Sequence, residues 1–224
     1  MNVIARGNTA DLCVYGDNTV CKLFISGYPK TYIEHEFNNS KFARVIGIET
    51  PTPYQLISID GRNGIVYERV LGDTLYNKLN YANEVERDKW IGKFSDLHKE
   101  ILRHHTDNVI DYKDVLKIFA ADSNEIVSRI DTLKNGDCLL HGDYHPGNVM
   151  VDTYNRLILI DMMNICKGPA EYDVARTYFL LESNKEFQNK YLRYMGYKVE
   201  ELIPYLEVIM LIRKRELNLQ NKSI

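Results

Sequence analysis

The first 70 residues are typical of short strands with one helix between them, and this pattern constrains the fold most. The stretch DLCVYGDNTVCKLF holds two β-rich runs joined by Gly16-Asp17-Asn18, which indicates a hairpin. A second hairpin is expected in YQLISIDGRNGIVYERV, with its turn near residues 60–64. Between them, residues 31–46 have apolar side chains at helical spacing, including Val45, and Pro51 then prevents continuation of the helix. We therefore predict a small antiparallel sheet with one helix.

The chain becomes mainly helical after Gly72. Helical patterns occupy residues 83–104, 111–134, 170–182, 184–195 and 199–219, and short apolar runs at 148–151 and 157–160 predict a small hairpin among them. We expect an α+β fold with two lobes. The first is a β-rich lobe of residues 1–70, the second is a mainly helical lobe of residues 71–224, and the boundary falls between Val70 and Asp73. A cleft between two lobes is a common place for a ligand.

Composition argues against several classes of protein. The 224 residues carry a net charge of −3, which is unlike a dedicated nucleic-acid binder. No apolar run approaches the roughly 20 residues that span a bilayer, and the first residues lack the apolar core of a signal peptide. The four cysteines lie far apart with no CxxC pair, which indicates reduced thiols and a cytoplasmic location. We predict neither a nucleic-acid partner nor a membrane partner.

The stretch HGDYHPGNVM, residues 141–150, carries the clearest chemical signal. Asp143 and Asn148 share a predicted loop, and Asp161 follows the apolar run 157–160. Carboxylate and amide oxygens suit Mg²⁺, and a carboxylate beside a hydroxyl can accept its proton. We interpret Asp143 as a base and Asn148 and Asp161 as metal ligands in phosphoryl transfer. The alternative is a polar turn stabilised by its own Asx side chains.

The order of these residues resembles a known signature. HGDYHPGN, followed by LILID and GPAEYD, is similar to the H-G-D-x-x-x-x-N, I-D and G-x-x-x-x-D motifs of the aminoglycoside phosphotransferase and choline kinase-like family. These enzymes are small-molecule relatives of protein kinases. The resemblance implies a two-lobed protein-kinase-like fold, Asp143 as catalytic base, and Asn148 and Asp161 as ligands of Mg²⁺ with bound ATP or GTP. It also implies that His141 is structural and that Asp173 braces the catalytic loop.

The resemblance also assigns nucleotide-binding residues in the N-terminal lobe. Lys22, inside the apolar strand 20–25, would hold the α- and β-phosphates of the nucleotide. A helix glutamate would pair with this lysine, and Glu36 fits the family position better than Glu34, although either is possible. Without the resemblance, Lys22 would be an edge charge in water, and the glutamates a solvated face or a favourable charge at a helix N-terminus.

A phosphate-covering loop and an adenine-binding hinge are implied as well. The loop ARGNTADLCVY has one glycine instead of G-x-G-x-x-G, so the Thr9 hydroxyl or neighbouring N–H groups would contact phosphate, but an ordinary β-turn fits equally well. GIVYERVLGDTL is similar to the hinge of the family, which implies that the Glu68 carbonyl and the Val70 N–H pair with adenine. Three residues are candidates for packing on the base, and each is an equally good core residue: Val45, Tyr67 and Ile160.

The other histidines carry weaker signals. His98 lies on an apolar helix face and is interpreted as a core histidine. His104 and His105 follow the same helix, where cations are favoured, and we assign no metal to them. His145 near Asp143 would suggest zinc, but no thiolate or third histidine is placed to complete that site.

We therefore predict an ATP-dependent phosphotransferase that moves the γ-phosphate to a hydroxyl of a small molecule, such as an aminoglycoside, a choline-like compound or another metabolite. From residue 182 onward there are six glutamates and eight lysines or arginines, a balance that mildly disfavours a polycationic acceptor. The alternative is a nucleotide-binding pseudokinase or interaction module. A serine/threonine protein kinase is a weaker alternative, because Asp161-Met162-Met163 replaces D-F-G and A-P-E is missing.

Overall fold

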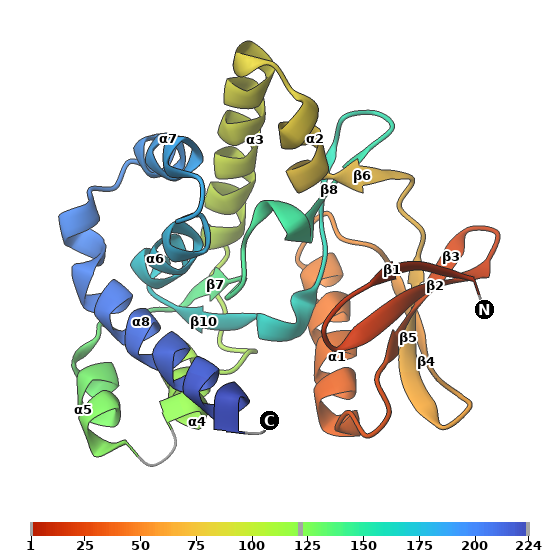
Figure 1. Ribbon diagram of the computed structural model, residues 1–224, viewed down its shortest axis with the longest axis horizontal. Helices are drawn as coiled ribbons and strands as arrows, with labels where there is room; N and C mark the ends of the chain where they lie inside the picture. The colour runs from red at the N-terminus through yellow and green to blue at the C-terminus, as the bar shows by residue number, and fades with distance from the viewer. Residues whose placement is uncertain (1, 121–122, 223–224) are drawn as a thin grey trace. The chain divides into compact units, whose positions relative to one another are not determined.

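The computed structural model describes residues 2–120 and 123–222, and the chain divides into two compact units. The first unit comprises Met1–Asn80 and Pro146–Asn164, and the second comprises Tyr81–His145 and Ile165–Ile224. Figure 1 labels the elements of both units, and each unit is described by itself.

The limits of these units differ from the predicted lobes of residues 1–70 and 71–224. Strand β6 (Gly72–Thr74) pairs with β8 (Val149–Asp152), which also pairs with β9 (Leu157–Leu159). These pairings keep β6 and the β8–β9 hairpin in the first unit. Pairing between segments that are so far apart in the chain leaves no local pattern, so a boundary drawn from local patterns alone could not include it.

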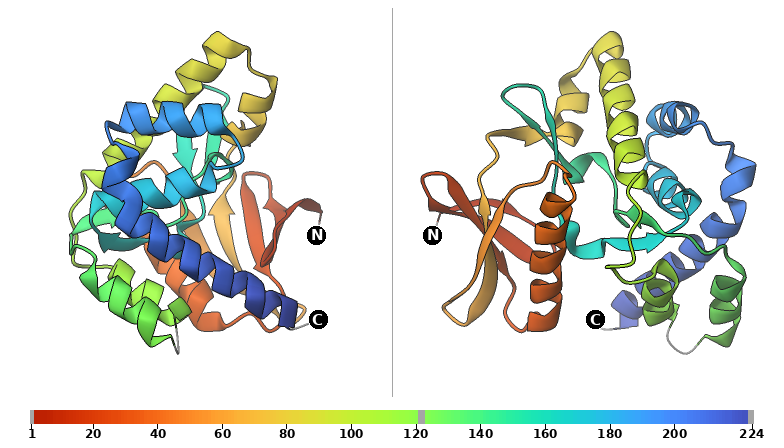
Figure 2. Two further views of the ribbon diagram at one scale, coloured as in Figure 1. Left: turned by 60° about the vertical axis from the view of Figure 1, so that its left-hand side comes forward. Right: turned by 180° about the vertical axis from the view of Figure 1, so that it is seen from behind.

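The first unit is built on a five-stranded antiparallel sheet in the order β1-β2-β3-β5-β4. Its strands are β1 (Val3–Arg6), β2 (Ala10–Gly16), β3 (Thr19–Phe24), β4 (Pro53–Ile59) and β5 (Arg62–Glu68). The two predicted hairpins are β2–β3 and β4–β5, and Asp60 and Gly61 have positive φ in the second turn, as a tight hairpin requires. Helix α1 (Lys30–Val45) packs against β4 and β5, as Figure 2 shows from two sides.

A compact apolar cluster joins the sheet to α1. Its buried members are Ala10, Phe24, Ile33 and Ile65, and Tyr28, Phe37, Tyr67 and Met163 pack against them. The side chain of Asn39 donates to the Met162 carbonyl at 2.9 Å, so the short 3₁₀ helix η2 (Met162–Asn164) is also fixed to α1. The cluster therefore holds together the three segments β3, α1 and the chain after β9.

The prediction that Val45 is a core residue was wrong. The buried face of α1 includes Ile33, Glu36, Ser40 and Ala43, which follow one another at intervals of three or four residues. Val45 falls off this face at the last residue of the helix and is 84% exposed. It is therefore not a core residue, and its packing on a base stays a prediction.

The second unit is mainly helical. It contains α3 (Glu84–Leu102), α4 (Tyr112–Ala120), α5 (Asn124–Thr132), α6 (Ala170–Leu180), α7 (Lys185–Met195) and α8 (Val199–Lys222), and short α2 (Leu75–Tyr81) precedes it. Strands β7 (Cys138–Leu140) and β10 (Cys166–Gly168) pair antiparallel between the helices. The predicted helix over 111–134 is two helices, α4 and α5, and residues 121 and 122 lie outside the described part of the chain.

Aromatic rings form the centre of the second unit. The ring of Tyr144 stacks between those of Phe94 and His98, with centroids 4.3 and 4.2 Å away, and Tyr191 of α7 packs on the edge of Phe94. The Tyr144 hydroxyl donates to the Phe94 carbonyl at 2.7 Å. Because Tyr144 directly follows Asp143, this cluster fixes the loop after β7 to helix α3.

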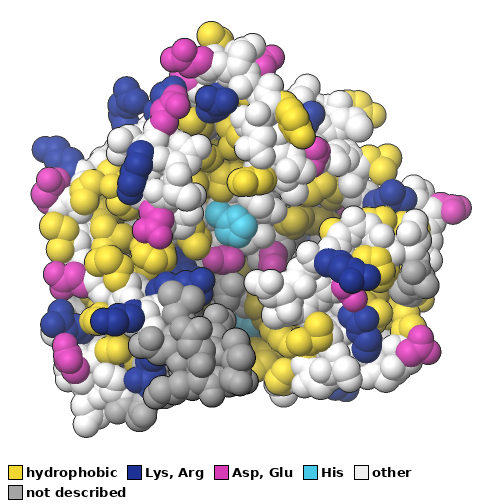
Figure 3. All heavy atoms as spheres, in the orientation of Figure 1, with side chains coloured by type: hydrophobic (Ala, Val, Ile, Leu, Met, Phe, Trp, Pro, Cys, Tyr) yellow, Lys and Arg dark blue, Asp and Glu magenta, His cyan; other side chains and the backbone are white. Residues whose placement is uncertain are grey.

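The surface carries charges of both signs. Figure 3 shows Lys and Arg side chains interspersed with Asp and Glu side chains on the face that it draws. Within residues 2–120 and 123–222, no helix has the length and apolar character needed to cross a membrane.

The pairing of β6 with β8 depends on a glycine. A Cβ at Gly72 would collide with the carbonyl oxygen of Val151 on β8. We expect Gly72→Ala to lower the free energy of unfolding by about 1–3 kcal/mol, because β6 must move away from its partner. Urea unfolding followed by circular dichroism measures this change.

The matched control is Gly92→Ala in α3, where the nearest atom to a new Cβ lies 3.9 Å away. Alanine replaces glycine in a helix interior with a gain of roughly 0.5–1 kcal/mol. Equal stabilities of the two variants would contradict the importance of the close approach at β6.

Candidate active site

Lys22 is the centre of an ionic cluster in the first unit. It lies in β3 between Cys21 and Leu23, which are buried in the sheet, and its side chain therefore projects to the opposite face. The Lys22 Nζ donates to both carboxylate oxygens of Glu36, at 2.8 and 2.9 Å, and to Asp161 Oδ1 at 3.1 Å. One ammonium thus joins a helix carboxylate to a carboxylate that follows β9.

The structure pairs Lys22 with Glu36 and not with Glu34. Glu36 is only 1% exposed, and its Oε1 also accepts the Tyr67 hydroxyl at 3.0 Å. Glu34 instead pairs with Lys30 on the surface, at 3.2 Å. Two residues along an α-helix are turned by about 200° from each other, so only one of the two glutamates can face β3.

The two carboxylates keep Lys22 charged. Burial alone lowers the pKa of Lys22, but the charges and hydrogen bonds of Glu36 and Asp161 raise it more, so the pKa lies above its ordinary value. A charged ammonium in a fixed position is able to bind phosphate, and this role of Lys22 stays a prediction. Tyr67 packs against the apolar cluster, as its core alternative predicted, and its hydroxyl donates to Glu36. Packing of Tyr67 on a base stays a prediction.

Asn148 and Asp161 lie at the same end of one hairpin. Strands β8 and β9 pair Val149 with Leu159, and the N–H of Ile160 donates to the Asn148 carbonyl at 2.9 Å. Asp161 is the next residue, and its φ of 63° is unusual for an aspartate. Such strained backbone is concentrated at functional sites.

This hairpin end suits a magnesium ion. The Asp161 carboxylate is partly exposed beside Lys22, and Asn148 adds an amide on the neighbouring strand, opposite Ile160. Mg²⁺ takes few protein ligands of this kind and completes its shell with phosphate and water oxygens. The residues present therefore fit the predicted ion, with Asn148 and Asp161 as the groups that would hold it.

The other residues that are predicted to contact the nucleotide also lie in the first unit. Thr9 is exposed in a tight turn between β1 and β2, where the Gly7 N–H donates to the Ala10 carbonyl at 2.9 Å. This hydrogen bond joins the ends of β1 and β2 and does not choose between the β-turn and the phosphate-covering loop, so both interpretations stay predictions. Glu68 ends β5, and Val70 lies in the link to β6. Their roles toward phosphate and adenine stay predictions.

In the second unit, a histidine and an arginine lie next to Asp143. Its Oδ2 lies 3.6 Å from His145 Nε2, and its Oδ1 lies 3.8 Å from an Nη of Arg176 on α6. Burial raises the pKa of Asp143, but His145, Arg176 and His141 together lower it more, so the carboxylate stays ionised. An ionised, partly exposed carboxylate is able to accept a proton.

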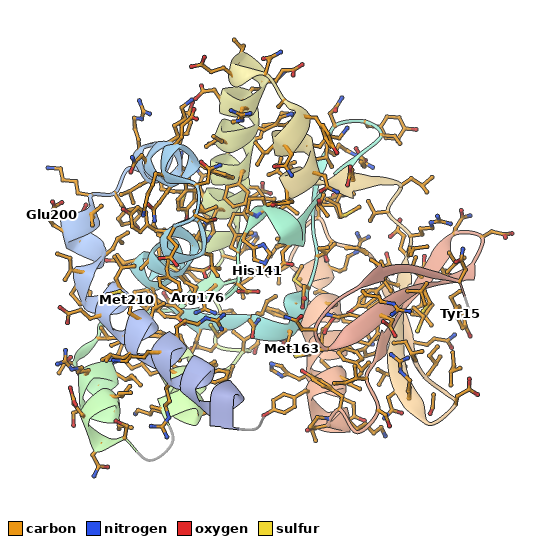
Figure 4. The ribbon with its side chains drawn as sticks, in the orientation of Figure 1. Tyr15, His141, Met163, Arg176, Glu200 and Met210 are labelled. Atoms are coloured by element: carbon orange, nitrogen blue, oxygen red, sulfur yellow. The ribbon has the colours of Figure 1, made fainter. Side chains whose placement is uncertain are left out.

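Asp173 braces the loop that carries Asp143. Its Oδ2 accepts the His141 N–H at 2.7 Å, and its Oδ1 accepts the Gly142 N–H at 2.9 Å. Gly142 has a φ of 75°, which a glycine adopts without strain. The predicted brace from the start of the next helix is therefore formed, and Figure 4 labels His141 on the loop and Arg176 on α6.

His98 holds the Asp173 carboxylate in place from helix α3. Its Nε2 lies 3.1 Å from Asp173 Oδ2, and its Nδ1 lies 2.7 Å from the Tyr191 hydroxyl. All of its polar atoms are paired in the core, as predicted. Burial raises the pKa of Asp173, but the hydrogen bond and charge of His98 and the charge of His141 lower it more.

Sequence reasoning missed Arg176 and the Tyr67 hydroxyl. Arg176 follows Asp173 by three residues, which places both on one side of α6, and this spacing is the signal that could have found it. The hydrogen bond from Tyr67 to Glu36 has no such signal, because it joins strand β5 to helix α1, which are far apart in the chain.

Comparisons with known proteins agree with this geometry. The sequence profile of a family described as "Phosphotransferase enzyme family" matches residues 4–201. Among solved structures, an aminoglycoside-3'-phosphotransferase of type VIII has a TM-score of 0.69 at 15% identity, over 91% of this chain and 89% of that chain. No curated protein matches the chain significantly.

Two further structures contain ligands. A ternary complex of a thermostable mutant of aminoglycoside phosphotransferase APH(4)-Ia with ADP and hygromycin B has a TM-score of 0.68 at 14% identity, over 96% of this chain and 83% of that chain. The streptomycin–ATP–APH(2'')-IIa ternary complex has a TM-score of 0.60 at 18% identity, over 97% and 81%. These similarities confirm the predicted kinase-like α+β fold.

The brace at Asp173 generates a prediction about stability. Asp173 is 0% exposed, and Asp173→Asn leaves His98 and two loop N–H groups with a weaker acceptor. We expect a loss of about 3 kcal/mol in the free energy of unfolding, the cost of breaking a buried pair. Exposed Asp96→Asn is the control, and we expect a change within about 0.5 kcal/mol.

The same carboxylate makes stability depend on pH. A carboxyl whose pKa is lowered by folding stabilises the protein above its unfolded pKa, and this contribution is lost as pH falls through the folded pKa. The wild type should therefore lose stability below about pH 4 more steeply than Asp173→Asn. Urea unfolding at a series of pH values measures the difference, and parallel curves would show that Asp173 is not the residue responsible.

Proposed function

Because the chain belongs to the phosphotransferase enzyme family, we propose that it transfers the γ-phosphate of ATP or GTP to a hydroxyl of a small molecule. The observation that carries this proposal is the cluster of Lys22, Glu36 and Asp161, in which two carboxylates share one ammonium. The predicted family and the predicted class, a small-molecule kinase, are confirmed by the family match and the shared fold.

The first unit would bind the triphosphate. Lys22, held by Glu36, would donate to the α- and β-phosphate oxygens, and the link from Glu68 to Val70 would pair with the purine. Asn148 and Asp161 would hold Mg²⁺, which neutralises charge on the transferring phosphate when bound. Because Asp161 and Glu36 share Lys22, the ammonium is already oriented before a nucleotide arrives, so little side-chain entropy is lost on binding.

Asp143 would act on the acceptor. It would accept the proton of the acceptor hydroxyl while orienting the oxygen toward the γ-phosphate, since phosphoryl transfer depends mostly on alignment. Arg176 and His145 would keep Asp143 ionised, and the hydrogen bonds from His141 and Gly142 to Asp173 would hold the loop in place. The rigid loop is what a general base needs to keep its position.

The acceptor is proposed only as a class. The structures compared above include complexes of related folds with hygromycin B and with streptomycin. A metabolite alcohol or an aminoglycoside would both suit a general base at Asp143, and no nucleic acid or membrane is needed. The cytoplasm stays the proposed compartment, on the spacing of the four cysteines.

A direct test is nucleotide consumption against a panel of hydroxyl-bearing metabolites and aminoglycosides, with phosphorus NMR of the product. A new phosphate monoester that depends on Mg²⁺ supports the proposal. Nucleotide binding without any phosphorylated product would favour the second candidate, a pseudokinase. Phosphorylation of protein serine or threonine in place of small molecules would favour a protein kinase.

Glu36 should matter far more than its neighbour Glu34. Glu36→Gln removes the charge that positions Lys22, and we expect kcat/KM to fall about 10²-fold, as for a misplaced binding group. Steady-state kinetics with Mg-ATP or Mg-GTP measure this loss. Glu34→Gln alters only a surface pair and should behave as wild type. Equal kcat/KM values for the two variants would contradict the role assigned to the Lys22–Glu36 pair.

Asp143 should affect the rate and not the affinity for nucleotide. Asp143→Asn keeps the shape and removes the base, so we expect kcat to fall by about 10²- to 10⁴-fold with the true acceptor. Calorimetry should give nearly unchanged nucleotide binding. Asp114→Asn on the exposed side of α4 is the control. Turnover within a few-fold of wild type in Asp143→Asn would mean that Asp143 braces the loop instead.

A further inference from the structure

A second set of metal-binding side chains lies in the second unit. The potential ligand atoms of His105, Asp137 and Cys138 all lie within 4.8 Å of one another. We propose that these three residues bind a Zn²⁺ ion. The site is separate in the chain from Asn148 and Asp161, which belong to the first unit, and it does not depend on the proposed phosphotransferase reaction.

The backbone holds the three residues side by side. His105 and Cys138 form an isolated antiparallel bridge, the Thr106 N–H donates to the Asp137 carbonyl at 2.9 Å, and the Leu139 N–H donates to the His104 carbonyl at 2.7 Å. The segment after α3 is thus fastened to the start of β7 on both sides of the site. Ligands on such a paired backbone need little ordering when a metal binds.

The donor set fits zinc better than magnesium or calcium. An imidazole nitrogen, a carboxylate oxygen and a thiolate sulfur are the three ligand types of Zn²⁺ in proteins, whereas Mg²⁺ and Ca²⁺ take oxygen. With three protein ligands, a water molecule completes the tetrahedron. The ion would therefore be exchangeable, because one coordination position stays open to solvent.

Only small side-chain rotations are required. Zinc–ligand bonds of about 2.0–2.3 Å place tetrahedral ligand atoms roughly 3–4 Å apart, slightly closer than the present limit of 4.8 Å. The side chains of His105 and Asp137 are 61% and 65% exposed and can turn freely. Their Nδ1 and Oδ1 atoms already share a hydrogen bond of 2.8 Å, in which Zn²⁺ would replace the proton.

The start of α6 also acts on the sulfur. The backbone N–H of Ala170, the first residue of α6, favours the thiolate form of Cys138, although burial and the charge of Asp137 raise the pKa of this thiol. Glu171, the next residue, adds a carboxylate whose charge acts on the same sulfur, and negative charge around a site favours a dication.

Zinc at this position would affect the loop that carries Asp143. Strand β7 ends at Leu140, and His141, Gly142 and Asp143 follow directly. An ion bound to Cys138 and His105 would clamp the start of this strand to the end of α3. From the sequence we assign no metal to His105, because a cation at the end of a helix explains it. Its partner Asp137 lies 32 residues away in the chain.

Binding can be tested without any activity measurement. Full-length protein, stripped with a chelator, is titrated with Zn²⁺ in the presence of millimolar Mg²⁺, and with Co²⁺ as a spectroscopic substitute. We expect the protein to bind one equivalent of Zn²⁺ tightly, without displacement by Mg²⁺, and to melt at a higher temperature with Zn²⁺ bound. With Co²⁺ we expect the visible d–d absorption of a tetrahedral site together with thiolate charge transfer. Absence of these signals overturns the proposal.

Variants identify the ligands. Cys138→Ser and His105→Ala should each weaken Zn²⁺ binding by more than about tenfold and abolish the thiolate or imidazole signature, respectively. His104→Ala is the matched control, since His104 contributes only its backbone carbonyl to this region. Asp161→Asn should leave the Zn²⁺ equivalent unchanged. Retention of binding in both ligand variants, or its loss in Asp161→Asn, shows that the metal binds elsewhere.

Discussion

The buried carboxylate of Glu36 is the constraint on which the first unit depends. A carboxylate with almost no exposure to water is expensive unless a cation and hydrogen-bond donors surround it. Lys22 supplies two bonds and Tyr67 a third, so β3, β5 and α1 must come together for the charge to be tolerated. Asp161 joins the same ammonium and thereby ties the chain after β9 to the sheet.

Such a pair is a poor source of stability. The desolvation of two charges offsets most of their attraction, and apolar residues of similar size often stabilise a core as well or better. The apolar cluster of Ile33, Phe24 and Ile65 already joins α1 to the sheet. The ionic cluster is therefore best explained by its chemistry, namely an ammonium fixed in direction and kept charged beside the hairpin end that carries Asn148 and Asp161.

The second unit also contains a buried carboxylate, and different groups surround it. Asp173 is fully buried, and contacts with His98 and with two N–H groups of the loop that it supports offset the cost of removing its charge from water. The aromatic stack of Phe94, Tyr144 and His98 anchors the residue after Asp143. The loop is thus held from both sides of Asp143, and the partly exposed carboxylate between these anchors is left for chemistry.

Local patterns in the sequence determined the two hairpins, most of the helices, the polar loop at 141–148 and the family resemblance, because strand alternation, helical spacing and motif spacing are short-range properties. The tertiary structure alone decided which glutamate meets Lys22, that Val45 faces away from the core, and that β6 and β8 join segments far apart in the chain. It also decided that His105 meets Cys138, in a different part of the chain. These outcomes depend on the rotation of helices about their axes and on pairing between segments that are far apart in the chain. Burial of the whole core sets both, so no short stretch of sequence predicts them.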